Sequence, residues 1–426
     1  MLLALVIRVA YAGLVLGDHQ PRSDAHHYHD LASSLAAGDG FALPFPFPDD
    51  EPQPTAFRPP LYPVVLAGAY AVFGDHVEVA QGLNVVLGVA VVAMAALVAC
   101  RLAGRRAGLV AGVLVAAYPP LVANDGTSLA EPLSLVLLLL GVLLLLDERV
   151  VAAGAVTGLQ VLTKPSAQGL ALVLATWILW RWGWRRALSF AVPVVLLVVP
   201  WVVRNQVVMG APVLVTSNGF NLAALYSPPS RAADAWLDPS TDPRLAAVRR
   251  EAVAAEDEVA WDQALRRVAV ERLRAHPTDL LDVSAANLLR LVELAPIRND
   301  AAEVLDGRNL PLRWATLWTT WLALPAGAIG LVVLRRRPAA QLLALSAVYF
   351  TAVSVPFSPM PPRLRAPLDL VCCIGAAVVL LGAMRGASSA DGSRGGDVID
   401  LRDSVLERER TAPTGAAVPT PERSTA

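Results

Sequence analysis

Long apolar stretches separated by short polar ones dominate the chain. Several of these stretches are nearly free of charge and approach the ~20 residues that a helix needs to cross a bilayer. The pattern predicts an all-α, polytopic transmembrane helical bundle. We expect about ten spans, near residues 1–17, 76–100, 107–122, 128–146, 150–163, 166–181, 187–203, 313–334, 339–357 and 366–384.

Composition supports a membrane protein. Of the 426 residues, 55% are hydrophobic and 17% are charged, whereas soluble domains have about 45–50% and about 25%. The net charge of −1 and the lack of a basic tract give no sign of a nucleic-acid partner. The three cysteines, Cys100, Cys372 and Cys373, lie in or beside apolar stretches and form neither a disulfide framework nor a metal-binding spacing.

Short arginine clusters predict the orientation of the bundle. Arg101–Arg106, Arg181–Arg186 and Arg335–Arg337 fall on one side under this span count, and basic loops face the cytoplasm. The same count makes residues 1–384 one transmembrane domain. The polar, Ser- and Gly-rich segment 385–426 is expected to be a disordered cytoplasmic tail. The extracytoplasmic loops are then 18–75, 123–127, 204–312 and 358–365.

The first apolar stretch has an alternative interpretation as a cleaved signal peptide. Ala10-Tyr11-Ala12 resembles a cleavage site, but a basic leading region is missing and Arg8 interrupts the apolar run. Cleavage would also invert the otherwise consistent charge pattern. We therefore favour a retained span.

Two of the predicted outer loops contain helical segments. In the long first loop, an apolar stripe predicts a short helix over Asp24–Ala37. In the loop 204–312, alternating charge predicts an amphipathic helix over Pro243–Ala275, which His276-Pro277 ends, and a second helix over Leu280–Leu294.

Acidic residues of the outer loops are candidates for catalysis. Asp24 could cap its helix, or it could act as a general base that takes a proton from an acceptor hydroxyl. Glu131 could favour the dipole of the following helix, or it could face Asp24 and help to hold a divalent ion or orient a base. The neighbouring histidines His26, His27 and His29 lack a closed set of metal ligands, so we predict no metal site there.

Basic residues at the outer ends of spans are the second unusual feature. They are costly in or near a membrane and usually face a partner or a cavity. A group of them at one depth favours an anionic ligand, and a lipid phosphate is the natural candidate. The alternative is that each extends to lipid headgroups or pairs with a nearby acid. The group comprises Arg58, Lys164 (the only lysine of the chain), Arg204, Arg363 and Arg365. In an extended, proline-stiffened loop, Arg363 and Arg365 would point the same way and suit phosphate binding.

A series of ordered motifs resembles a known superfamily. The motifs include Ser-Asp-Ala-x-x-Tyr-x-x-Leu-Ala at 23–32, Arg-Pro-Pro-Leu-Tyr-Pro at 58–63, Ser-Leu-Ala-Glu-Pro at 128–132, Thr-Lys-Pro at 163–165, Pro-Trp-x-x-Arg-Asn at 200–205, His-Pro at 276–277 and Arg-Leu-Arg-Ala-Pro at 363–367. In order and side, they resemble the GT-C superfamily of polytopic glycosyltransferases, in particular the protein O-mannosyltransferase and aminoarabinose-transferase-like group. The likeness covers most of residues 1–384.

The resemblance implies a function and roles for individual residues. Superfamily members move a sugar from a polyprenyl-phosphate donor to an acceptor on the outer face, with inversion. Asp24 would be the catalytic carboxylate and Glu131 a supporting acid. The candidates for the donor phosphate are Arg58, Lys164, Arg363 and Arg365, and the substrate-pocket candidates are Tyr28, Tyr62, Arg204 and Asn205.

The sequence departs from this pattern at two positions. Many relatives carry a second acid directly after the loop aspartate, where this chain has Ala25. The Thr-x-Pro motif more often carries arginine, where this chain has Lys164. The second change keeps the charge but loses a bidentate fork.

These observations favour an inverting glycosyltransferase of a bacterial plasma membrane, with its active site on the extracytoplasmic face. Its partners would be the bilayer, the polyprenyl-phosphate sugar, and a protein, glycolipid or polysaccharide acceptor. No cofactor is required, and a divalent metal remains an open alternative. The rival hypotheses are a flippase for lipid-linked saccharides and a catalytically inactive scaffold of the same fold. The chain has neither repeated halves nor clear broken midplane helices, which are frequent in transporters.

Overall fold

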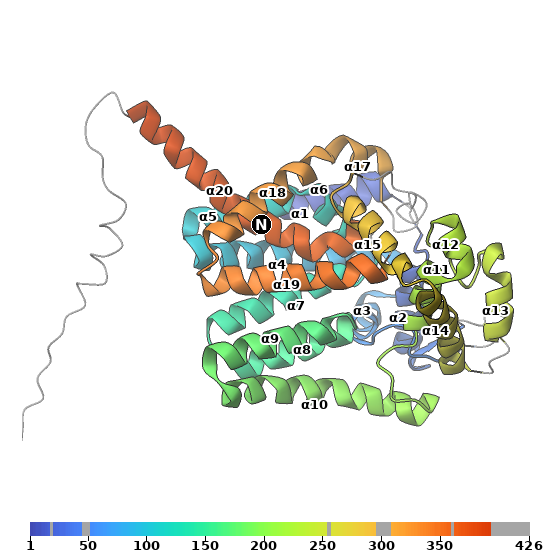
Figure 1. The fold of residues 1–426 in the computed structure, drawn as a ribbon. Helices are drawn as coiled ribbons and strands as arrows, with labels where there is room; N and C mark the ends of the chain where they lie inside the picture. Colours follow the sequence, from blue (N-terminus) through green and yellow to red (C-terminus); the bar gives the residue numbers. More distant parts are fainter. Residues whose placement is uncertain (18–19, 45–51, 254–256, 295–307, 359–361, 393–426) are drawn as a thin grey trace, which may run out of the picture. The chain divides into compact units, whose positions relative to one another are not determined.

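Helices make up almost all of the regular secondary structure in the described part of the chain (Figure 1). The computed structural model describes the chain except for residues 18–19, 45–51, 254–256, 295–307, 359–361 and 393–426. The chain divides into two units, Met1–Leu381 and Gly382–Ala426. The fold and site described below belong to the first unit.

Apolar helices form a bundle in which α4, α7, α8, α9, α10 and α19 lie side by side (Figure 1). Each region predicted as a span contains a helix or a pair of helices. They are α1 (Leu2–Ala10) with a π-helix (Tyr11–Leu16), α4 (Val77–Ala103), α5 (Arg105–Ala117) with α6 (Pro119–Asp125), α7 (Glu131–Leu146), α8 (Val150–Thr163), α9 (Ala167–Trp182), α10 (Trp184–Met209), α17 (Leu310–Thr316) with α18 (Trp318–Val333), α19 (Pro338–Phe357) and α20 (Ala366–Gly392).

The number of spans is smaller by strict length and composition. Four helical stretches qualify, at Val77–Ala103, Trp184–Met209, Pro338–Phe357 and Arg363–Ala383. Counting the bent pairs α5–α6 (64°) and α17–α18 (49°) as single spans gives up to six. Prolines 119 and 120 explain the first bend, because proline disfavours helical backbone at the preceding residue. The prediction of a membrane helical bundle is confirmed, while the count of ten stays a prediction.

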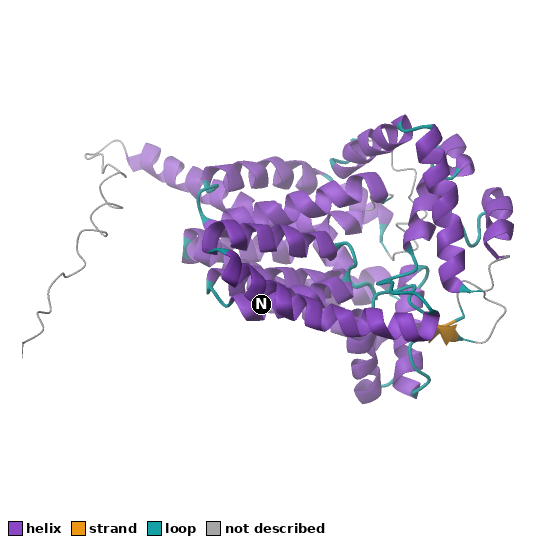
Figure 2. Cartoon of the chain, turned by 60° about the horizontal axis from the view of Figure 1, so that its bottom comes forward, coloured by secondary structure: helices purple, strands orange, loops and turns teal. Residues whose placement is uncertain are grey.

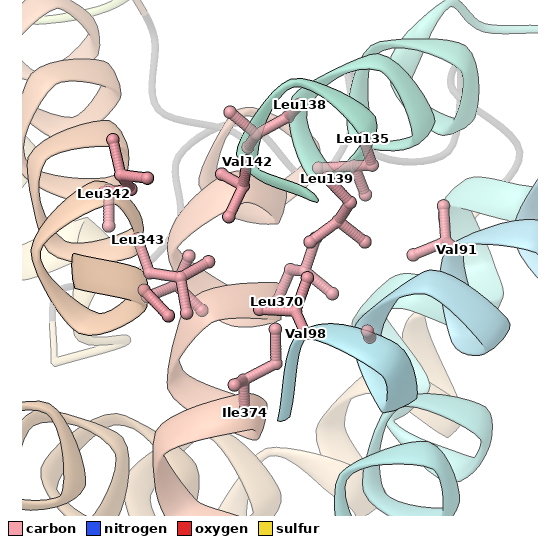
Figure 3. Close-up of a cluster of buried hydrophobic side chains, with 14 of the residues drawn as sticks. Val91, Val98, Leu135, Leu138, Leu139, Val142, Leu342, Leu343, Leu370 and Ile374 are labelled. Atoms are coloured by element: carbon pink, nitrogen blue, oxygen red, sulfur yellow. The ribbon is translucent and has the colours of Figure 1, made fainter. Parts of the chain in front are cut away.

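The core of the bundle is a large cluster of buried aliphatic side chains (Figure 3). It draws Val91 and Val98 from α4, Leu135, Leu138, Leu139 and Val142 from α7, Leu342 and Leu343 from α19, and Leu370 and Ile374 from α20. Small residues let α18 and α20 approach closely: a side chain at Gly327 would lie 2.3 Å from the Cα atom of Cys372. Such contacts are common between membrane helices, where packing replaces the hydrophobic effect.

The predicted outer loops fold into short helices and one strand pair, the only strands in the described part of the chain (Figure 2). The expected helix is present as α2 (Asp24–Ala37), and β1 (Ala42–Leu43) pairs antiparallel with β2 (Gln53–Pro54). The sequence did not predict α3 (Leu61–Phe73). The later elements are α11 (Asn218–Tyr226), α12 (Pro228–Ala233), a 3₁₀ helix (Pro243–Leu245), α13 (Ala246–Val253), α14 (Glu258–Ala275), α15 (Thr278–Leu291) and a second 3₁₀ helix (Pro362–Arg365).

Two sequence predictions about helix bounds need correction. The helix expected over Pro243–Ala275 is interrupted: α13 ends at Val253, and α14 begins at Glu258 after Asp257, whose carboxylate caps it. Asp is a favoured N-cap residue, so it starts a new helix here. The expected tail begins later than residue 385, because α20 continues to Gly392. The rest of the predicted tail lies outside the described residues.

The arginine clusters and the outer-loop elements mark opposite ends of the bundle. At one end, Arg101 pairs with Asp147 at 2.5 Å and Arg186 pairs with Glu148 at 2.7 Å. The elements α2, α3 and α11–α15 lie at the other end (Figure 1). The candidate catalytic residues are therefore separated from the basic end by the length of the bundle. Which membrane face each end occupies stays a prediction.

Candidate functional site

Asp24 lies between two arginines that are distant in sequence. Arg58 donates a hydrogen bond from Nη2 to Oδ1 of Asp24, and Arg363 donates one from Nη2 to Oδ2 at 2.6 Å. The Asp24 side chain is 23% exposed. Ser23 occupies the N-cap position of α2, so Asp24 is not the cap and sits in the first turn, where negative charge is still favoured.

The Arg58 guanidinium is held by neighbouring rings. Its Nη2 donates to Nδ1 of His27 at 3.0 Å, and its Cζ lies 4.8 Å from the centroid of the Phe57 ring. The Tyr28 ring is 5.9 Å away. These contacts are cation–π and hydrogen-bonding interactions that fix the direction of the side chain. Arg58 is thus aimed at Asp24 by the helix α2 itself and by its own neighbour in the chain.

The charges around Asp24 set its protonation. Burial alone would raise the pKa of Asp24, but the guanidinium groups of Arg58 and Arg363 outweigh it and hold the pKa well below its usual range. Burial and the Arg58 charge lower the pKa of His27 to about 3. His27 is therefore neutral near pH 7, which leaves Nδ1 able to accept a hydrogen bond from Arg58. Asp24 is an anion that makes a weak base while both arginines stay in place.

Glu131 and Lys164 form a second ion pair next to this cluster. Lys164 follows the end of α8, and its Nζ lies 3.0 Å from Oε1 of Glu131, the first residue of α7. Tyr28 is close enough to both ion pairs for the charges of each to change its pKa. Burial raises the pKa of Tyr28, and the charges of Arg58, Asp24, Glu131 and Arg363 also act on it. The structure therefore brings most of the predicted site residues together.

Tyr62 connects the helices that carry the two ion pairs. It is fully buried, packs edge-on against Tyr28 at 5.1 Å, and donates from its hydroxyl to Oδ1 of Asn84 at 3.2 Å. Asn84 in turn donates to the carbonyls of Leu129 and Thr127, just before α7. Tyr62 links α2, α3, α4 and the loop that leads to Glu131.

Arg204 and Asn205 hold loops. Arg204, near the end of α10, donates to the carbonyl of Thr55 at 2.8 Å and to that of Phe41 at 3.3 Å, so it joins both arms of the β1–β2 pair. Asn205 donates to the carbonyl of Val213 at 2.8 Å. Both residues were predicted as substrate-pocket candidates. Arg204 also donates to Oδ1 of Asn205 at 3.0 Å, and its guanidinium lies 5.0 Å from the centroid of the Trp201 ring.

Arg365 points away from Arg363. Its Nε lies 2.8 Å from Asp369 and its Nη1 lies 2.9 Å from Glu293, and its side chain is 2% exposed. The segment is a 3₁₀ helix rather than the extended loop that we expected. With three residues per turn, side chains two positions apart diverge instead of sharing a face. Of Arg363 and Arg365, only Arg363 contacts Asp24.

Two buried charged contacts were not predicted from the sequence. Arg8 in α1 pairs with Asp125 in α6 at 2.7 Å, and both side chains are almost completely buried. The lone arginine in an apolar stretch was the available signal, because such a charge normally has a partner. Glu258 at the start of α14 accepts hydrogen bonds from the segment that carries Arg58. No local pattern marks Glu258, because its partners are about 200 residues away in the chain.

A metal site is not apparent in the part of the chain that the structure describes. No three His, Cys, Asp or Glu side chains gather there in a way that could hold an ion. Both Asp24 oxygens are instead engaged by guanidinium groups. The participation of a divalent metal, which the sequence leaves open, stays a prediction.

Comparisons with known proteins bear on the fold. No family model and no curated protein matches the chain. The Archaeoglobus fulgidus oligosaccharyltransferase in complex with Zn and sulfate aligns over 91% of this chain and 49% of its own, at 13% identity and a TM-score of 0.52. The same organism's AglB in complex with an inhibitory peptide and a dolichol-phosphate aligns over 96% and 53%, at 13% identity and a TM-score of 0.46. ArnT from Cupriavidus metallidurans bound to undecaprenyl phosphate aligns over 92% and 79%, at 18% identity and a TM-score of 0.39.

This chain thus spans about half the length of the oligosaccharyltransferase. At this level of identity the likeness concerns the arrangement of helices and strands. The chain therefore shares the fold of the oligosaccharyltransferase over most of its own length.

Proposed function

We propose that the protein is a membrane glycosyltransferase that moves a sugar from a polyprenyl-phosphate donor to an extracytoplasmic acceptor, with inversion. The observation that carries the proposal is the position of Asp24, half-buried at one end of the bundle between Arg58 and Arg363. The fold supports it, since the solved neighbours include ArnT bound to undecaprenyl phosphate and AglB with a dolichol-phosphate. The acceptor would be a protein, a glycolipid or a polysaccharide.

The reaction needs a base and a stabilised leaving group. The acceptor hydroxyl oxygen attacks the anomeric carbon of the sugar, its proton passes to a carboxylate oxygen of Asp24, and the bond from that carbon to the phosphate oxygen breaks. Polyprenyl phosphate leaves with the bonding electrons. Cations aimed at its oxygens stabilise the charge that develops there.

Donor binding would also activate the base. With both guanidinium groups on Asp24, its pKa lies too low for efficient proton transfer. A donor phosphate competes for Arg58 and Arg363, because arginine binds phosphate in the same forked geometry as carboxylate. As the arginines turn to the phosphate, the pKa of Asp24 rises toward its ordinary value. Proton abstraction is then coupled to the presence of the donor.

Lys164 is the third cation of the proposed phosphate site. It lies 3.0 Å from Glu131, which would orient it in the absence of the donor. We leave Arg365 out of this assignment, because Glu293 and Asp369 already engage it. The predicted location in a bacterial plasma membrane, with this end of the bundle facing outward, completes the proposal.

Lipid analysis of cells with and without the protein tests the function directly. If the protein is the transferase, a polyprenyl-phosphate sugar accumulates without it, and Asp24→Asn fails to clear that lipid. Loss of a general base lowers transfer by about 10²–10⁴-fold. Purified Asp24→Asn should still bind undecaprenyl phosphate, and more tightly than wild type, because the competing carboxylate charge is gone.

Asp30→Asn is the matched control. Asp30 lies on the same helix, is similarly exposed at 26%, and contacts the exposed His26 at 3.2 Å. It should clear the lipid as wild type does. An unchanged lipid pool, or full rescue by Asp24→Asn, would reject the transferase and favour a lipid-linked saccharide flippase or an inactive scaffold.

A further inference from the structure

One carboxylate outside the bundle ties down the segment that leads to Arg58. The Oε2 atom of Glu258 accepts a hydrogen bond from the Thr55 hydroxyl at 2.6 Å, and its Oε1 accepts one from the backbone N–H of Ala56 at 3.0 Å. The Thr216 hydroxyl also donates to Oε1. Glu258 is 8% exposed. Three donors from two distant segments therefore converge on one buried side chain.

The contacts continue from Glu258 to the guanidinium of Arg58. The Thr55 hydroxyl oxygen accepts a hydrogen bond from the Phe57 N–H at 2.9 Å, which fixes the turn before Arg58. The Phe57 ring is 1% exposed and packs edge-on against Phe220 of α11 at 5.5 Å. The same ring lies under the Arg58 guanidinium. A rigid path thus runs from α14 to the cation that contacts Asp24.

Thr55 is held on its other side as well. Arg204 of α10 donates to its carbonyl at 2.8 Å, while Glu258 of α14 binds its hydroxyl. Burial raises the pKa of Glu258, and the hydrogen bonds from Thr216, Thr55 and Ala56 oppose that rise. A buried acid is costly unless its hydrogen-bonding capacity is met. Here that capacity is met by Thr55, Ala56 and Thr216, none of which belongs to α14.

We propose that Glu258 is a positioning residue of the transfer reaction, which holds Thr55 and Ala56 so that Arg58 reaches Asp24 and the donor phosphate. This inference rests on the proposed function. It gives α14 a part in the reaction through the hydrogen bonds from Thr55 and Ala56 to Glu258. Glu258 acts through Arg58 and is not itself a catalytic residue.

Asp262 provides a matched control on the same helix. It lies one turn after Glu258, is 2% exposed, accepts from the Gly219 N–H of α11, and pairs with Arg266 at 2.7 Å. Asp262→Asn keeps the volume of the side chain and an oxygen that can accept from the Gly219 N–H. The Thr55 hydroxyl and the Ala56 N–H donate to Glu258 rather than to Asp262. Glu258→Ala removes both acceptor oxygens and with them all three hydrogen bonds, and Glu258→Gln keeps one carbonyl oxygen.

Binding of undecaprenyl phosphate to the full-length protein in nanodiscs is the functional measurement. We expect Glu258→Ala to weaken binding by about tenfold or more, the effect of losing a hydrogen bond to a charged group. Glu258→Gln should recover part of this loss, and Asp262→Asn should bind within about threefold of wild type. In an Arg58→Ala background, Glu258→Ala should add almost nothing, because residues that act through one another are not additive.

Hydrogen exchange of the amides of Ala56 and Phe57 gives a readout that needs no transfer activity. Exchange should be faster in Glu258→Ala and unchanged in Asp262→Asn. If the wild-type protein transfers no sugar, the proposed function fails, yet this exchange still tests the contact. The inference is overturned if Glu258→Ala leaves both amides protected, or if it weakens binding equally with and without Arg58.

Discussion

His27 aims Arg58 without adding charge to the site. A protonated histidine could not accept the hydrogen bond from Nη2 of Arg58 and would repel the guanidinium. Burial and the Arg58 charge keep His27 neutral by lowering its pKa to about 3. The ion pair between Arg58 and Asp24 therefore depends on a neighbour that must stay unprotonated.

This dependence predicts how stability changes with pH. Between pH 7.5 and 5 the folded protein binds no proton at His27, whereas the unfolded chain does so below its ordinary pKa of about 6.5. Stability must then fall as the pH drops, by up to about 1.4 kcal/mol for each unit below 6.5. The lowered pKa of Asp24 places its own titration below this window. We expect the melting temperature of wild type in detergent to fall more between pH 7.5 and 5 than that of His27→Asn.

The asparagine keeps an acceptor near the position of Nδ1 but cannot be protonated in this range. His26→Asn is the control, because the His26 side chain is 59% exposed. It should retain the wild-type slope. Identical slopes for wild type and His27→Asn would show that His27 is not buried as a neutral ring.

The sequence identified charged residues better than it identified their partners. Asp24, Arg58 and Arg363 stood out because charges near a membrane need a reason to be there, and the structure brings the three together. Arg365 looked equivalent to Arg363, but whether both reach one ligand depends on local backbone geometry. These residues form a four-residue 3₁₀ helix, in which Arg365 pairs with Glu293 instead of Asp24. Short helices of this kind leave little periodic signal in a sequence.

At the level of elements, α1, α4 and α6 meet at a buried ion pair. Arg8 and Asp125 pair at 2.7 Å, and Arg8 also donates to the carbonyl of Ala116 at 3.2 Å. Gly88 of α4 makes room for them. A Cβ atom there would lie 2.3 Å from Oδ2 of Asp125 and 2.7 Å from Nε of Arg8. A buried pair tolerates little displacement, because desolvated charges are stabilised only in good geometry.

Gly88→Ala should therefore destabilise the protein. Overpacking of a close-packed site typically costs about 1–3 kcal/mol, and displacement of the ion pair adds to that cost. Thermal unfolding in detergent measures the effect. Gly82→Ala on the same helix is the control, because a Cβ atom there meets nothing within 4 Å. Equal melting temperatures for the two variants would mean that α4 can shift away from the pair freely.

Periodicity and length predicted the long elements and the short helix α2, but they missed α3. The apolar stretches became helices because any other backbone would leave polar groups unpaired in a membrane. The helix α3 was hidden in a predicted loop, since its 13 residues are too few to cross a bilayer. The contacts of Glu258 and Arg204 with Thr55 join segments about 200 and 150 residues apart, which no local pattern encodes.

For the whole molecule, the separation of the two ends makes orientation testable. The basic end carries Arg335–Arg337 and the pairs of Arg101 and Arg186. The opposite end carries Asp24 and the helices α11–α15 (Figure 1). Basic loops favour the cytoplasm, so the site should face outward. A polyprenyl-phosphate sugar in the outer leaflet would then reach Asp24 without crossing the membrane again.

Labelling of single cysteines at the two ends of the bundle tests this orientation in intact cells. The native Cys100, Cys372 and Cys373 are first replaced by alanine; the last two are buried, and none lies in the candidate site. Ala275→Cys and Arg336→Cys then place one thiol at the exposed end of α14 and one in the basic loop before α19. A membrane-impermeant maleimide should label Ala275→Cys in intact cells and label Arg336→Cys only after the cells are opened. The reverse pattern would place Asp24 in the cytoplasm, where a soluble sugar nucleotide, rather than a lipid-linked sugar, would become the donor to test.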